Sequence, residues 1–589
     1  MPVKVRGYLS PTLVLLAFDW PEGKDRDDFL GFAVKRTPGF WSAEGTTREA
    51  ASWLPNRNTF HGPVTAGQPD VPSKDAPIQK FMWWDNRIES GKQEDRAGTF
   101  SYVVYPVVGT PAAPMLLDGR SAICELKLPA HVEDGVGTWF NRAVMRSQAF
   151  SRKVLAMGLA PNQPPPPDKD LELRTWLANG MERAIPSVLD GATVAVGAAY
   201  HLTDKLWIIP QLRQFSSDHG HEATLVYDAH PVKQGNAPAK PTPNADAVRE
   251  LGHDIEFCPR DKTNIMHDKI LVTNTGASKP ARVLMGSANF TTEGLTQQAN
   301  LLHTFASEEL AALYNERLAA MASNPGLAAT ASLTQDWSPS IQVGSVTKVR
   351  AIFSPEPTGR QVQTGTIIAA IGAAQHSVLF CMFSPTDEPL INACFRKGDE
   401  GKMMFGLVNR LSRNTGTIHL KANASGKPVT QAQLAAIELY HRSKAKRDVV
   451  DGMYFTKDAV PDGYEPELPV YPGEQPPPYP PVVIHHKFII IDAEGADPIV
   501  YTGSANMSEN SLHHNDENLL EIRSPKIAAI YLAEFMRLYE HFRARAIAIE
   551  VGKDPARKLD LTLAPDARWA RKYYVEGSPE CKARKAMAQ

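Results

Sequence analysis

The sequence has few cysteines and no long apolar run, and both features exclude classes of protein. Its 589 residues include five cysteines, an odd number without a closely spaced set, so we expect a reduced chain rather than a disulfide framework. No apolar run approaches the roughly 20 residues that span a bilayer. The short run 13–18 leads into Asp19 and Trp20 instead of the small-residue cleavage site of a signal peptide. We therefore predict a soluble, cytoplasmic protein.

The sequence also lacks an excess of charge of either sign. There are 63 Lys and Arg against 65 Asp and Glu, a net charge of −2, so no global field draws the protein to nucleic acid or to an anionic membrane. Attraction of a phosphate must therefore be local. Metal-binding spacings such as His-Glu-x-x-His are absent around the histidine pairs 219/221, 485/486 and 513/514, and we predict neither a metal nor a cofactor.

One phrase occurs twice in the chain. His-Asp-Lys at 267–269 is followed by Gly-Ser-Ala-Asn at 286–289, and His-His-Lys at 485–487 by Gly-Ser-Ala-Asn at 503–506. The two histidines are 218 residues apart and the two serines 217, so the internal spacing is kept to one residue. This pattern indicates an internal duplication.

Each phrase predicts a strand that carries His-x-Lys, followed by a second apolar strand that runs into the Gly-Ser-Ala-Asn turn. Side chains alternate along a strand, so His267 and Lys269 should lie on the face opposite Asp268. His485 and Lys487 should share a face in the same way. A histidine alone is more often a hydrogen-bonded core residue, but duplicated buried cations need an anion. The pattern therefore favours a site for an anion.

These residues resemble the phospholipase D superfamily, whose signature is His-x-Lys-x4-Asp followed by Gly-Ser-x-Asn, usually twice per active site. The second copy matches fully, with Asp492 as the structural acid of the motif. The first copy has Asn274 in that place, which puts the support of its strand in question. The resemblance implies a metal-independent phosphodiesterase that works through a phosphohistidine intermediate, with one histidine as nucleophile and the other as general acid and then base.

The resemblance also assigns the surrounding groups. Around the phosphoryl oxygens it implies two lysines, two serines and two asparagines: Lys269, Lys487, Ser287, Ser504, Asn289 and Asn506. A carboxylate after the second motif orients a histidine of the opposite half in this family. Aligned on Asn-Leu-Leu, Glu517 has Ala299 as its counterpart, so only one half keeps an acid there. We predict that Glu517 serves His267 as nucleophile and that His485 is the general acid; the alternative is a helix-start carboxylate without a catalytic role.

The fold class that we predict is α/β, with two pseudo-twofold-related phospholipase D-like sheet halves at 165–340 and 345–589. Short strands between Pro- and Gly-rich turns predict a β-sandwich over 1–150, which resembles an immunoglobulin-like module. We expect helices over 140–157, 176–189 and 526–548. The proline-rich stretch 471–481 is either a rigid connector or a docking segment for a partner.

The substrate follows only from the resemblance. The turns Gly-Ser-Ala-Asn-Phe-Thr and Gly-Ser-Ala-Asn-Met-Ser look more like those of nuclease-type members than of phospholipases, so we predict a nucleic-acid phosphodiester. The alternatives are a phospholipase D-type hydrolase or transphosphatidylase, and a non-catalytic scaffold with a degenerate first half. A monomer suffices for the active site, and a homodimer is compatible with it.

Overall fold

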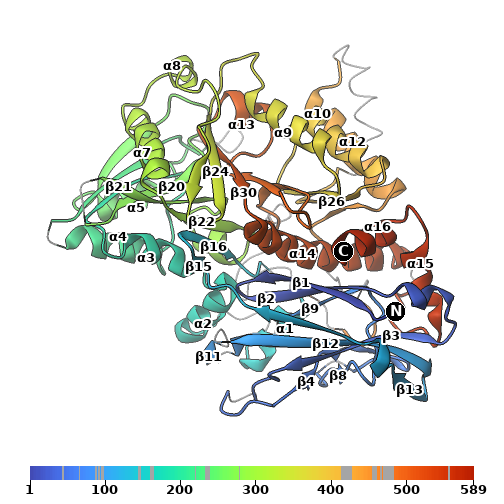
Figure 1. Ribbon diagram of the computed structural model, residues 1–589. Coiled ribbons are helices and arrows are strands. Elements are labelled where there is room, and N and C mark those ends of the chain that lie inside the picture. Colours follow the sequence, from blue (N-terminus) through green and yellow to red (C-terminus); the bar gives the residue numbers. More distant parts are fainter. Residues whose placement is uncertain are drawn as a thin grey trace.

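The computed structural model has a β-rich part and two α/β parts, and Figure 1 shows the β-rich part below the other two. It describes residues 1–589 except 43–44, 66, 87–88, 91–92, 95–97, 144–146, 160–164, 219, 233–238, 277–278, 413–427, 454–459, 465–466, 468–482 and 555–556. The predicted proline-rich segment 471–481 thus lies outside the described residues.

The two α/β parts contain eight-stranded sheets of the same topology. The first has the order β15 (Val132–Glu133), β16 (Val136–Phe140), β22 (Leu301–Ala306), β21 (Pro280–Gly286), β20 (Lys269–Asn274), β17 (Val194–Ala199), β18 (Glu222–Asp228) and β19 (Glu256–Arg260). The second has the order β23 (Ile341–Val343), β24 (Thr347–Ser354), β30 (Glu517–Arg523), β29 (Ile499–Gly503), β28 (Lys487–Ile491), β25 (Ser377–Met382), β26 (Met403–Val408) and β27 (Val449–Asp451). Corresponding neighbours are parallel or antiparallel in the same way. The chain therefore has a mixed α/β fold with several sheets.

Helices and shared core explain why these strands are so apolar. Strand β28 reads Lys-Phe-Ile-Ile-Ile with every residue buried, as expected where both faces of a sheet are covered. One continuous core contains residues of both sheets together with α7 (Glu308–Ala322) and α14 (Pro525–Val551). Separate cores cover the outer face of each sheet. The helices there and at the loops are α3 (Ala184–Leu189), α4 (Ile208–Ser217), α5 (Ala245–Leu251), α6 (Thr292–Thr296), α8 (Leu327–Ala331), α9 (Val362–Ala373), α10 (Glu388–Asp399), α12 (Gln431–Ala445) and α13 (Glu509–His513).

The β-rich part combines the two ends of the chain. Its larger sheets are β1 (Lys4–Ser10), β2 (Leu13–Asp19) and β9 (Met82–Asp85), and β13 (Ala113–Leu116), β12 (Thr99–Thr110), β3 (Phe29–Thr37) and β4 (Ser52–Trp53), with β14 (Ala122–Lys127) also on β12. Shorter elements are η1 (Pro21–Asp25), β5 (Pro55–Asn56), β6 (Asn58–Thr59), β7 (Gly62–Pro63), β8 (Val71–Pro72), β10 (Glu89–Ser90), β11 (Gln93–Glu94) and η2 (Asp118–Arg120). The C-terminal η4 (Ala567–Ala570), α15 (Arg571–Tyr574) and α16 (Pro579–Met587) close it, and Trp569 stacks on Phe81 with ring centroids 5.6 Å apart.

Two predicted helices differ from the structure. The helix expected over 140–157 is shorter, since Phe140 ends β16 and α1 (Gln148–Ala156) begins only after its N-cap Ser147. The helix expected over 176–189 is broken: α2 (Pro167–Ala178) ends where Asn179 and Gly180 have φ of 57° and 90°, and η3 (Met181–Arg183) and α3 follow. Left-handed backbone ends an α-helix.

The edge of the first sheet bears on the domain bounds. Strands β15 and β16 fall inside the predicted module 1–150, yet β16 pairs with β22 from Val136 opposite Phe305 to Phe140 opposite Leu301. Residues 132–140 are thus strands of the first α/β sheet. The bounds 1–150, 165–340 and 345–589, and the β-sandwich itself, stay predictions.

Candidate active site

Each histidine of the duplicated motif lies just before its strand and is paired with the opposite half of the chain. Strands β20 and β28 begin at the lysines, not at the histidines. The His267 N–H donates to the Asp516 carbonyl over 2.9 Å, and the His485 N–H donates to the Ala299 carbonyl over 3.0 Å. Parallel bridges join Met266 to Asp516 and Ala299 to Ile484. Backbone hydrogen bonds therefore connect the two halves at the two histidines.

The two lysines are completely buried beside the histidines. Each Nζ donates to the carbonyl of the histidine two residues earlier. Lys487 Nζ donates to the His485 carbonyl over 2.6 Å, and Lys269 Nζ donates to the His267 carbonyl. Burial lowers the pKa of Lys269 to about 7, and burial and Lys269 lower the pKa of Lys487 well below its usual value. The Glu517 carboxylate raises the pKa of both lysines, but burial outweighs it, so a further anion would stabilise their charged forms. The lysines therefore make a site for a negative group.

His267 is oriented by a carboxylate from the other half. Its Nδ1 lies 2.7 Å from Glu517 Oε2, and both side chains are buried. Because a carboxylate only accepts, Nδ1 carries the proton and Nε2 keeps its lone pair. Glu517 Oε1 accepts from Ser511 Oγ (3.0 Å) and Asn515 Nδ2 (3.1 Å). Burial, Lys269 and Lys487 hold the pKa of His267 well below its usual value.

His485 is oriented by a neutral amide instead. Its Nδ1 lies 2.9 Å from Asn300 Oδ1 and 3.1 Å from the Ser287 carbonyl. Asn300 Nδ2 donates to the Gly294 carbonyl (2.8 Å), which turns Oδ1 toward His485. Two acceptors around one ring nitrogen make that nitrogen a donor here too. Burial, Lys487, Lys269 and His267 lower the pKa of His485.

The structural counterpart of Glu517 is Asn300, which corrects the alignment with Ala299. Gly286 pairs with Leu302 in the first sheet and Gly503 with Leu519 in the second, so position 300 corresponds to 517. The repeated letters Asn-Leu-Leu shift this match by one residue. Residue 299 matches Asp516 instead, since each carbonyl accepts from the N–H of the opposite histidine.

The serines and asparagines of the two turns differ in their bonding. Ser287 Oγ donates to Asn300 Oδ1 (2.8 Å) and accepts from the Leu301 N–H (3.1 Å). Ser504 Oγ accepts from the Asn518 N–H over 3.1 Å. By contrast, Oδ1 of Asn289 and of Asn506 is buried without a hydrogen-bond partner among the described residues. The serines hold the turns together, while the asparagine amides retain unsatisfied groups.

Asn274 supports its strand as Asp492 does. Asn274 Oδ1 accepts from the backbone N–H of Thr193 (2.8 Å) and Val194 (3.0 Å), just where β17 begins. Asp492 accepts from the N–H groups of residues 375, 376 and 377 at the start of β25. An amide oxygen and a carboxylate oxygen both accept such bonds. The departure from the motif thus leaves the bonding of the first half intact.

One family model matches the part of the chain that contains the second motif copy. The family model described as "Cardiolipin synthase, PLD-like domain" matches residues 367–539, which hold the second copy of the motif. Residues 367–539 thus form a phospholipase D-like domain.

Individual relatives match over short stretches. An uncharacterized protein of Acanthamoeba polyphaga mimivirus is 42% identical over 59 residues, which are 10% of this chain and 21% of that protein. A mitochondrial cardiolipin hydrolase of Mus musculus is 34% identical over 59 residues, 10% of this chain and 25% of that protein. The chain thus spans a quarter or less of these curated relatives. Among solved structures, phosphatidylserine synthase of Haemophilus influenzae has a TM-score of 0.41 at 13% identity, covering 64% of this chain and 89% of that one.

Two asparagines of this phospholipase D-like site escaped sequence reasoning. One is Asn300, and the other is Asn141, which follows β16 and is 1% exposed. The Asn300 N–H donates to Asn141 Oδ1 (3.0 Å), and the Asn141 N–H donates to the Asn300 carbonyl (3.3 Å). Asn141 Nδ2 also donates to the carbonyls of Gln298 (2.7 Å) and Leu295 (3.1 Å). Asn141 therefore holds the loop that positions Asn300 beside His485. No sequence motif includes Asn141, so nothing in the sequence indicates this role.

A buried ion pair fixes the residue next to Glu517. Arg260, at the end of β19, donates through Nε and Nη2 to the two carboxylate oxygens of Asp516 (2.8 and 3.1 Å), and all of these atoms are inaccessible to solvent. Thr263 Oγ1 donates to Asp516 as well (2.6 Å). These bonds cross between the halves and hold the backbone that carries Glu517.

The described residues also bear on the histidine pairs and on the question of membrane-spanning helices. Of the histidine pairs, His219 is not described; His485 and His486 point in opposite directions, since His486 packs on Phe140 and Phe488. In the described part of the chain no three His, Cys, Asp or Glu side chains gather as a metal site would require, and no helix there is long and apolar enough to cross a membrane.

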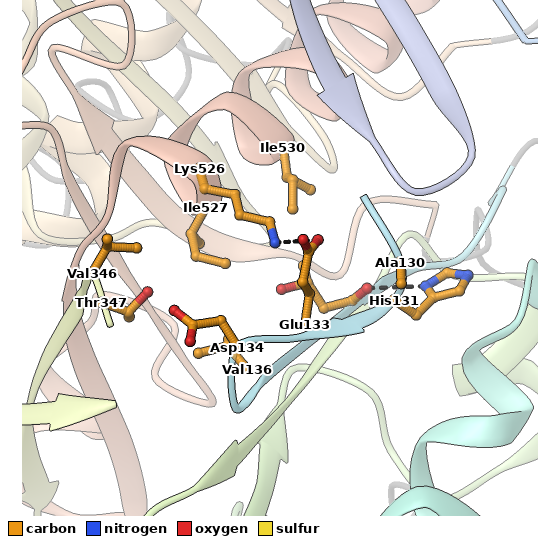
Figure 2. Close-up of a pocket in the computed structure, with 11 residues that line it drawn as sticks. Ala130, His131, Glu133, Asp134, Val136, Val346, Thr347, Lys526, Ile527 and Ile530 are labelled. Atoms are coloured by element: carbon orange, nitrogen blue, oxygen red, sulfur yellow. Dashed lines mark hydrogen bonds and ion pairs between the residues drawn. The ribbon is translucent and has the colours of Figure 1, made fainter. Parts of the chain in front are cut away.

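Figure 2 shows a small cavity at a different place, between the β15–β16 hairpin, the start of β24 and α14. Its eleven described lining residues include none of the duplicated motif. Glu133 pairs there with Lys526, and Asp134 accepts from the Ser345 N–H over 2.8 Å. This cavity lies between the two sheets, and neither His267 nor His485 lines it.

Proposed function

We propose that this protein is a metal-independent phosphodiesterase that forms a phosphohistidine, with a nucleic-acid backbone as substrate. The observation that carries the proposal is the pair of buried His-x-Lys segments in which each histidine Nδ1 is held by a residue of the opposite half, Glu517 or Asn300. This arrangement leaves both Nε2 atoms for one phosphorus. The two halves would be related by a pseudo-twofold axis, so that one chain supplies a complete site.

The first step uses the two histidines differently. Nε2 of His267 attacks phosphorus and forms the P–N bond while the P–O bond to the leaving group breaks. His485, protonated, gives its Nε2 proton to the departing oxygen. The positive charge that the phosphorylated His267 ring carries lies against the Glu517 carboxylate, whereas His485 has only the neutral Asn300 beside it. The carboxylate therefore favours His267 as the nucleophile.

The second step reverses these roles. His485 takes a proton from water as the water oxygen attacks phosphorus, and the P–N bond breaks to return neutral His267. During both steps Lys269 and Lys487 would neutralise the equatorial oxygens. The unsatisfied amides of Asn289 and Asn506 would turn their NH₂ groups to the same oxygens. The Ser287 and Ser504 hydroxyls would act one step removed, by holding those turns.

A phospholipid substrate is the second candidate, favoured by the similarity to the cardiolipin synthase PLD-like domain family and to the mouse mitochondrial cardiolipin hydrolase. The scaffold alternative rested on Asn274, and the bonds of Asn274 to β17 remove that reason. We further propose a cytoplasmic location, which the five free cysteines favour.

The test is incubation of the purified full chain, in excess EDTA, with single- and double-stranded DNA, RNA, phospholipid vesicles and bis(4-nitrophenyl) phosphate. We expect hydrolysis of the nitrophenyl diester and of nucleic acid, lost in His267→Asn. Activity that EDTA abolishes and Zn²⁺ or Mg²⁺ restores contradicts metal independence. Turnover of vesicles alone identifies a phospholipase, and turnover of none of these diesters rejects the enzyme.

A further inference from the structure

Two aromatic side chains stand at equivalent positions beside the two histidines. Tyr200 directly follows β17 and Phe383 directly follows β25; the Tyr200 N–H donates to the Asp268 carbonyl (3.0 Å) and the Phe383 N–H to that of His486 (2.9 Å). The duplication therefore places one aromatic ring in each half at an equivalent position beside the motif.

On the first side the aromatic surface is doubled. The Tyr200 ring meets the His267 ring edge-on with centroids 4.8 Å apart, and its other neighbour is His201, stacked at 3.9 Å with an interplanar angle of 17°. Lys269 Nζ lies 4.9 Å from the Tyr200 centroid. Both rings are only half-buried. Because the two rings are stacked on each other, His201 covers one face of Tyr200, and the face of His201 turned away from Tyr200 is the flat surface that this pair offers beside His267.

On the second side the ring is single. Phe383 lies 5.4 Å from the His485 ring, with Lys487 Nζ 5.4 Å from its centroid, and it too is half-buried. Since His485 gives its proton to the leaving oxygen in the proposed mechanism, Phe383 borders the leaving-group side of phosphorus.

His201 is not a further phosphate ligand. Burial and Lys269 lower the pKa of His201 to about 4, so its ring is neutral near pH 7 and offers a π face rather than a charge. Packing of the lysine stems alone would be served by aliphatic side chains. Two half-exposed aromatic surfaces, one on each side of a nearly closed phosphate site, match a ligand that carries a flat group on each side of its phosphate.

We propose that Tyr200 with His201, and Phe383, are stacking surfaces for the two nucleobases that flank the scissile phosphate of a single-stranded nucleic acid. This inference rests on the proposed function and narrows its substrate. His267 and His485 are only 5% and 7% exposed, so a phosphate on the surface of a nucleic-acid double helix could not reach them without distortion of that double helix. Bases paired and stacked in a duplex present no face to a side chain, whereas unpaired bases stack on aromatic rings. An amino headgroup of a phospholipid would instead bring a third cation beside Lys269 and Lys487.

The experiment compares single-stranded oligonucleotides that carry one cleavable phosphodiester, with an abasic residue on either side of it or on neither. For the wild-type protein we expect each abasic residue to lower kcat/KM about tenfold, the loss of one base stack. A fully paired duplex should be cleaved at least about tenfold more slowly than the single strand. Phe383→Leu should lose the discrimination on the leaving-group side, and Tyr200→Leu on the other, while Tyr200→Phe retains it.

Tyr105→Leu is the matched control, because Tyr105 is a half-buried aromatic of β12 that packs on Trp53 in the β-rich part; it should retain both discriminations. Equal cleavage of normal and abasic strands, or of duplex and single strand, overturns the inference, as does hydrolysis of phospholipid vesicles alone. Failure of the proposed function shows separately, as no hydrolysis of bis(4-nitrophenyl) phosphate. Even then, anisotropy with labelled strands and His267→Asn protein measures stacking: equal Kd for normal and abasic strands refutes it.

Discussion

The two sides of the active site share a topology but differ in the group that faces the histidine. On one side the Nδ1 of His267 meets a carboxylate, Glu517, and on the other the Nδ1 of His485 meets an amide, Asn300. Both groups sit at the same register of equivalent strands. A duplicated framework therefore needs only one charged atom group to give its two halves different chemical roles, because a carboxylate stabilises an imidazolium and an amide merely orients it.

The largest difference between the two sides is expected when each histidine is replaced in turn. His267→Asn and His485→Asn should each lower kcat by at least about 10⁴-fold. They should differ in what accumulates: after an alkaline quench, mass spectrometry of the His485→Asn protein should find a phosphohistidine at residue 267, with none in His267→Asn. A label at residue 485 in the latter would reverse the assignment.

The second break exchanges the charges next to the rings. Glu517→Gln should lower kcat by about 10² to 10⁴-fold, because the phosphorylated ring loses its counterion. Unchanged kcat would remove the reason for assigning His267 as nucleophile.

Asn300→Asp should act on pH dependence rather than on rate. Burial and the lysines lower the pKa of His485, so loss of its proton sets the alkaline limb of kcat/KM. A new carboxylate at 2.9 Å raises that pKa, and the limb should move to higher pH by about one unit or more. A shift to lower pH would contradict this reading of His485 as the acid.

A weaker perturbation acts through Asn141. Asn141→Ala removes the side-chain bonds to the 294–300 loop and should lower kcat about tenfold with little change in KM, while destabilising the fold by about 1–3 kcal/mol. Asn56→Ala is the matched control, since Asn56 is 5% exposed and bonds the carbonyls of Ala76 and Pro77 far from the site. It should lower Tm comparably and leave kcat unchanged. Equal losses of kcat in both variants would reduce Asn141 to general stability.

The smallest effect is expected where the two motif copies differ in sequence. Asp492→Asn should cost about 1 kcal/mol or less, because an amide oxygen accepts the same bonds and asparagine tolerates the φ of 52° found there. Asn274→Asp should be as mild. Thermal unfolding measures both, and a loss of more than about 3 kcal/mol would mean that the charge itself is needed.

The sequence predicts the site better than its surroundings. Two copies of His-x-Lys and Gly-Ser-Ala-Asn are local patterns, so His267, Lys269, His485 and Lys487 could be named as candidates from the sequence alone. Asn300 was missed by one residue, because the apolar Leu-Leu pairs can be aligned equally well in two registers and only the ladder chooses between them. Asn141 lies 159 residues from Asn300, and nothing local in its sequence foretells that contact. The helix over 176–189 failed at Asn179, where left-handed backbone overrides helical spacing.

The aromatic core of the β-rich part has a consequence for biosynthesis. Phe29 lies in β3 and Phe81 directly precedes β9, but their ring partners Trp569 and Tyr573 follow about 500 residues later in the chain. At about 5–20 residues per second of translation, that interval is roughly 25–100 s. The β-rich part is therefore begun before both α/β parts and completed only after them, and until residues 569 and 573 are made its aromatic face is open to a chaperone.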